Sequence, residues 1–104
     1  MSIITGKWVQ EQGQAFEGLW FEFKSDGTFE AAYDPMGIES GGTYQIEGNH
    51  IDMDQAAHTL GMIGFFKGLF EIKNDKLFMA LGSSPGCDRP EDLSGARIYV
   101  KEEN

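Results

Sequence analysis

Four side chains that could bind a metal ion lie close together in the chain: His50, Asp52, Asp54 and His58. Imidazole and carboxylate groups together suit Zn²⁺ or another divalent cation. On an extended strand, His50, Asp52 and Asp54 would all point to one face, which we expect to be the outer one. Their spacing matches no established metal motif. An exposed acidic strand end carrying two unrelated histidines explains the pattern better, so we assign no metal site.

Cys87 is the single cysteine, so no disulfide can form within the chain. A nucleophilic cysteine needs a neighbouring base, and no histidine lies near it in the sequence. We expect an exposed loop thiol and a reducing, cytoplasmic setting. Carboxylates are plentiful, but no pair stands out as catalytic. The sequence therefore predicts neither an enzyme nor a cofactor, although a buried polar cluster would reopen the enzymatic alternative.

The charge balance excludes several classes of partner. The 104 residues carry a formal charge of −9, from 17 acidic and eight basic residues. The eight basic residues are scattered, whereas nucleic-acid binding needs a basic surface, and anionic membranes are disfavoured for the same reason. No apolar run approaches the ~20 residues that span a bilayer, and the N-terminus does not read as a signal peptide. We expect one soluble domain over residues 1–104.

Apolar residues alternate with polar ones along most of the chain, which is the pattern of β-strands. Asp26-Gly27, Gly48-Asn49 and Asn74-Asp75 are turn residues that separate three pairs of such segments. Eight short strands at regular spacing favour an all-β, eight-stranded antiparallel up-and-down barrel. The expected strands cover residues 6–11, 17–24, 28–34, 42–47, 50–54, 66–72, 77–81 and 96–101.

Two stretches break the alternation, residues 54–65 and 82–95. The first could hold a short helical turn before Gly61, and the second is polar and rich in turn formers. We interpret both as long loops, which in compact domains are often functional.

The first expected strand opens with Gly6-Lys7-Trp8, a G-x-W motif. Together with the segments LWFEFKSDGTFEA, GGTYQIEGNHIDM, KGLFEIKNDKLFMALG and DRPEDL, it resembles short bacterial lipocalin-like domains of unassigned function, in the calycin superfamily. The resemblance covers most of residues 6–100. It implies a closed barrel in which Trp8 plugs one end and Arg97, on the last strand, packs over Trp8. It implies almost no chemistry.

An eight-stranded barrel is either filled by side chains or holds one small ligand. We expect a non-enzymatic module that binds a small apolar or amphipathic ligand. The alternative is a structural or interaction domain with a filled core, which could form a homodimer. Leu60, Met62, Ile63 and Phe65 could form a lid opposite Trp8, or instead seal a full core or a dimer contact. The expected ligand-binding residues are Phe21, Phe23, Phe29, Tyr33, Tyr44, Leu60, Met62, Phe70 and Met79.

Overall fold

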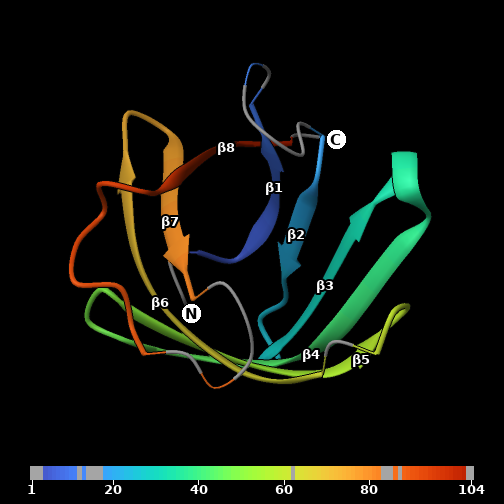
Figure 1. The fold of residues 1–104 in the computed structure, drawn as a ribbon. Helices are drawn as coiled ribbons and strands as arrows, with labels where there is room; N and C mark the ends of the chain where they lie inside the picture. The colour runs from blue at the N-terminus through green and yellow to red at the C-terminus, as the bar shows by residue number, and fades with distance from the viewer. Residues whose placement is uncertain are drawn as a thin grey trace.

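The sheet of this protein closes on itself. In a computed structural model that describes residues 4–11, 13, 18–61, 63–82, 86 and 88–102, eight antiparallel strands follow one another around a barrel in sequence order (Figure 1). Strand β8 pairs with β1 and closes the ring. The predicted eight-stranded up-and-down barrel is confirmed. The strands are β1 (Gly6–Gln10), β2 (Trp20–Phe23), β3 (Thr28–Tyr33), β4 (Ile38–Glu47), β5 (His50–His58), β6 (Gly64–Lys73), β7 (Lys76–Leu81) and β8 (Arg97–Lys101).

The hairpin turns form where the turn residues predict them. Between β2 and β3, the Asp26 carboxylate accepts hydrogen bonds from the backbone N–H of Thr28 at 3.0 Å and from its hydroxyl at 2.6 Å. Between β6 and β7, Asn74 and Asp75 both have left-handed backbone, with φ of 55° and 64°. Two successive residues of this kind give a turn whose twist matches that of the flanking strands. Local turn chemistry therefore sets the order of the hairpins.

The prediction of a long loop over residues 54–65 is wrong. β5 continues to His58 and β6 already begins at Gly64, which leaves only residues 59–63 between them. β4 likewise begins at Ile38, well before the expected position 42. The described part of residues 82–95 contains no strand, as expected. The described helical structure is a three-residue 3-10 turn, η1 (Asp34–Met36), and no helix within the described residues is long and apolar enough to cross a membrane.

A β-bulge explains why the alternation seems to stop in β5. Gly41 pairs with Ala57 but Gly42 pairs with Gln55, so Ala56 is an extra residue with no partner on β4. Such a bulge moves every later residue to the opposite face of the sheet. Gly42 makes it feasible, because a Cβ atom there would collide with the Asp54 carbonyl oxygen. The break in the pattern is therefore a change of face within a continuing strand.

Several of the fully buried side chains, among them Phe23 and Phe29, lie toward the end of the barrel where β1 begins, which we call the Trp8 end. There Phe23 and Tyr44 meet edge to face, with ring centroids 5.0 Å apart, and Phe21 stacks on Phe23 at 5.8 Å. Aromatic contacts of this geometry stabilise a core beyond the area that they bury. The Tyr44 hydroxyl donates to the Lys24 carbonyl oxygen at 2.8 Å, so its polar atom is satisfied. This end is filled by side chains.

Candidate functional site

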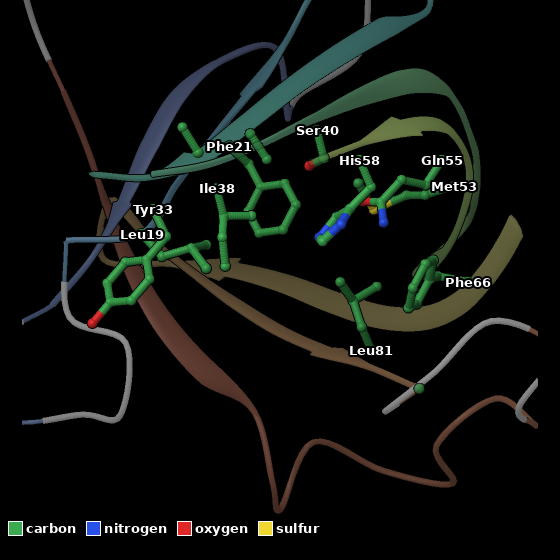
Figure 2. A pocket seen from close by; sticks show the side chains of 13 residues that line it. Leu19, Phe21, Tyr33, Ile38, Ser40, Met53, Gln55, His58, Phe66 and Leu81 are labelled. Atoms are coloured by element: carbon green, nitrogen blue, oxygen red, sulfur yellow. The ribbon is translucent and has the colours of Figure 1, made fainter. Parts of the chain in front are cut away.

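The opposite end of the barrel is hollow. We call it the cavity end; it is where β3 ends, β4 begins, β5 ends and β6 begins. A cavity of about 230 Å³ opens there, and its exposed lining is mostly apolar (Figure 2). Its lining residues belong to the strands β2 to β7 or directly flank β2 and β7. The lining residues are Leu19, Phe21, Ala31, Ala32, Tyr33, Ile38, Ser40, Met53, Gln55, His58, Phe66, Leu81 and Gly82.

A second hollow of about 380 Å³ adjoins the first and shares Leu19, Phe21, Leu81 and Gly82 with it. It lies beside the junction of β8 and β1, where Gln10 and Tyr99 are paired. Burial raises the pKa of the Tyr99 hydroxyl well above its ordinary value, although the charge of Arg97 lowers it. Tyr99 is thus a neutral phenol at neutral pH. Arg97 lines this second hollow, whereas no Lys or Arg is among the described residues that line the first cavity.

Among the described residues that line the first cavity, His58 is the only titratable group besides Tyr33. It pairs with Ser40 on β4, after the bulge, and Figure 2 shows its ring directed into the cavity toward Phe21 and Ile38. The backbone N–H of Leu60 donates to His58 Nδ1 at 3.0 Å, and Gly61 N–H donates to the His58 carbonyl oxygen at 3.0 Å. The turn after β5 therefore holds the ring in place.

The structure distributes the expected ligand-binding residues over three environments. Phe21 and Tyr33 line the first cavity, and Phe21 and Met79 line the second. Leu60 is 69% exposed and lines neither, so it does not cover the first cavity as a lid would. Ile63 and Phe65 are also exposed, and Met62 lies outside the described residues. The remaining four, Phe23, Phe29, Tyr44 and Phe70, are buried in the core away from both cavities.

Trp8 is buried at its own end of the barrel, with 2% of its surface exposed, and its indole Nε1–H donates to the Ile4 carbonyl oxygen at 2.8 Å. The expected partner of this ring was Arg97, but the strand register brings Lys101 opposite Trp8 instead. Lys101 Nζ lies 5.7 Å from the ring centroid. Arg97 is at the other end of β8, beside Met79. A Cβ atom on Gly6 would lie 2.7 Å from Lys101 Cε, so Gly6 leaves room for that lysine.

The four candidate metal ligands are not brought together. The bulge turns His58 into the barrel, whereas His50 stays exposed on the outer face. Asp52 instead accepts a hydrogen bond from Arg89 Nη2 at 2.8 Å, while Arg89 Nη1 donates to the Gly68 carbonyl oxygen. Within the residues that the structure describes, no group of three or more metal-binding side chains is found. Cys87 lies outside the described residues.

Sequence reasoning missed most of the cavity, including Ile38, Ser40 and Gln55, and it considered His58 only as a metal ligand. The expected strands began at position 42 and ended at position 54, so these residues fell in presumed loops. One signal could have found them. The apolar and small residues at 38, 40, 42, 44 and 46 continue a period of two, and a glycine pair inside a strand pattern is typical of a bulge.

The comparisons with known proteins give no family for this barrel. No protein-family model, no curated protein and no solved structure matches the chain.

Proposed function

We propose that this protein is a non-enzymatic binding module that holds a small apolar or amphipathic molecule at the cavity end of its barrel. The observation that carries the proposal is the mostly apolar hollow of about 230 Å³. Engineered protein cavities of about 150 Å³ with apolar walls already bind benzene. Pockets for larger ligands run from roughly 300 Å³ upward, a range that the adjoining hollow of about 380 Å³ reaches.

Filling the first cavity tests this function. Ala31 faces the interior between Phe29 and Tyr33, so Ala31→Leu adds carbon atoms to the cavity without adding charge. We expect it to weaken binding of the uncharged, fluorescent one-ring probe 4-(dimethylamino)benzonitrile by roughly tenfold, about 1.4 kcal/mol. Ala57→Leu is the matched control, because Ala57 is exposed and lines neither hollow. Probe fluorescence gives both affinities. Equal binding by both variants, or no binding by the wild type, would contradict the proposal.

A second candidate function is association with another copy of the chain. Leu60, Ile63 and Phe65 are 69%, 56% and 64% exposed around the β5–β6 turn. Clusters of large exposed apolar side chains are typical of interaction surfaces. Sedimentation equilibrium tests this alternative. A dimer in the wild type that dissociates in Phe65→Lys would support it, and a monomer at every concentration would exclude it.

We further infer that the protein is a short lipocalin-like domain of the calycin superfamily, from bacteria, and that it works in the cytoplasm. The closed up-and-down barrel supports the first inference, together with the burial of Trp8 in β1 at the end away from the cavity. A single cysteine supports a reducing compartment.

A further inference from the structure

The tautomer of His58 follows from its hydrogen bond to the chain. Nδ1 accepts the Leu60 backbone N–H, and in a neutral imidazole the nitrogen that accepts a hydrogen bond carries no hydrogen. The ring proton is therefore assigned to Nε2. Since Figure 2 shows the ring directed into the first cavity, this assignment puts an N–H donor there.

That donor has no partner in the described part of the chain. Within the described residues, the hydrogen bond from Leu60 is the one interaction of the His58 side chain, and it uses the other ring nitrogen. The walls around the ring include Phe21, Ile38 and Leu81, which offer no acceptor atoms on their side chains. A donor that faces such walls gains from a ligand that brings an acceptor. The cavity is thus mostly apolar in its walls, and the polar side chains of Ser40 and Gln55 also line it.

Among the described residues, no Asp, Glu, Lys or Arg lines the first cavity, so they give it no fixed charge. An anion that entered would lose its hydration without meeting a cation, which is costly in an apolar site. An uncharged acceptor loses far less. The ligand that these walls fit is therefore neutral.

We propose that the first cavity binds an uncharged, mainly apolar molecule of about one ring that carries a carbonyl-type oxygen, and that His58 Nε2–H donates to this oxygen. The proposal rests on the proposed function and specifies the ligand class for the same cavity. The volume of about 230 Å³ sets the size, and the unpaired Nε2–H donor sets the position of the oxygen.

A pair of nearly isosteric compounds tests the donor. Acetophenone carries the carbonyl oxygen, and α-methylstyrene replaces it by a CH₂ group. We expect the ratio of their affinities, ketone over hydrocarbon, to fall roughly 3- to 10-fold in His58→Phe, the loss of one neutral hydrogen bond. The matched control is His50→Phe, which alters the exposed histidine at the other end of β5 and should leave the ratio unchanged. Ligand-observed NMR titration measures all six affinities.

A measurement on the wild type keeps the test independent of how well His58→Phe folds. The ¹⁵N resonance of His58 Nε2 should shift on addition of acetophenone and stay in place with α-methylstyrene. Two outcomes refute the role of His58 while the proposed function stands, provided that both compounds bind. The affinity ratio could be the same in all three proteins, or the Nε2 resonance could stay unshifted when acetophenone is added. If benzoate binds more tightly than acetophenone, the uncharged class is refuted. If neither compound binds the wild type, the proposed function fails as well.

Discussion

The two ends of the barrel follow the same inward–outward alternation and differ in the size of the side chains that they turn inward. At the Trp8 end, Trp8, Phe23 and Phe29 fill the interior. At the cavity end, β3 and β4 contribute Ala31 and Ser40, and the space that larger side chains would occupy stays empty. Closure of the sheet therefore does not determine whether the interior of a barrel is filled, because the volume of the inward side chains determines the filling separately at each end.

Because of this difference, one end of the barrel contributes most to stability and the other end provides the space for a ligand. An unfilled cavity costs a protein stability, in proportion to the contacts that its walls forgo. Here the aromatic contacts of the Trp8 end stabilise the closed sheet, so the cavity end can stay hollow. A binding site built on the rigid strands of such a barrel is also held in a defined geometry.

The largest expected effect compares one substitution at the two ends of β7. Leu77 is fully buried at the Trp8 end, and Leu81 borders both hollows. Leu77→Ala should lower the free energy of unfolding by about 3–4 kcal/mol, within the range for buried leucines. Leu81→Ala should cost only about 1–2 kcal/mol, because Leu81 already lacks contacts on one side. Urea denaturation gives both values, and equal losses would show that the two ends are packed alike.

A smaller effect tests the bulge that separates the two ends. In Gly42→Ala the new Cβ would collide with the Asp54 carbonyl oxygen, so the bulge must shift or open. We expect a loss of about 1–3 kcal/mol, as for other overpacked sites, together with a displaced His58 imidazole resonance in the NMR spectrum. Gly95→Ala is the control, since its Cβ would meet open space and should leave both quantities unchanged. An unperturbed His58 in Gly42→Ala would show that the bulge does not orient the ring.

The smallest effect concerns the β2–β3 turn at the Trp8 end. The Thr28 hydroxyl, and then its backbone N–H, donate to Asp26 and lower the pKa of that carboxyl. A lowered pKa in the folded state gives stability that is present above the ordinary pKa of aspartate, about 3.9, and is lost as the pH falls through the folded value. Asp26→Ala should therefore have a lower thermal midpoint than the wild type at pH 6, and the gap should narrow below about pH 4. If the difference in thermal midpoint between the two proteins did not depend on pH, the loss of stability would come from turn geometry alone.

The fold could be predicted from local signals. Asp26-Gly27 and Asn74-Asp75 specify tight turns, and the residues between the turns alternate, so the strand order follows from the hairpins. The inward direction of Phe23, Phe29 and Tyr44 could be predicted for the same reason, because they lie on unbroken alternating segments. They were expected to contact a ligand, but they lie in the core and line neither hollow.

The cavity end could not be predicted in the same way. Its strands carry Ser40, Gln55 and His58 at inward positions, and polar residues there look like the end of a strand. The bulge at Ala56 then reverses the face of every residue after it, and this depends on the close approach of Gly42 to the neighbouring strand. Lys101, and not the expected Arg97, lies beside Trp8 because the strand register determines which cation of β8 is placed there. The sequence pattern alone does not set this register.

The closure of the ring by β1 and β8 also bears on how the chain assembles. Each of the other pairings joins strands that are neighbours in the sequence, whereas Trp8 and Lys101 pair across more than ninety positions. Bringing distant segments together costs loop-closure entropy, and such contacts slow folding. The β1–β8 seam should therefore form last and exchange its amide hydrogens first. Gln10 and Tyr99 face each other across this seam and line the second hollow, so an occupant there would touch both strands and delay their separation.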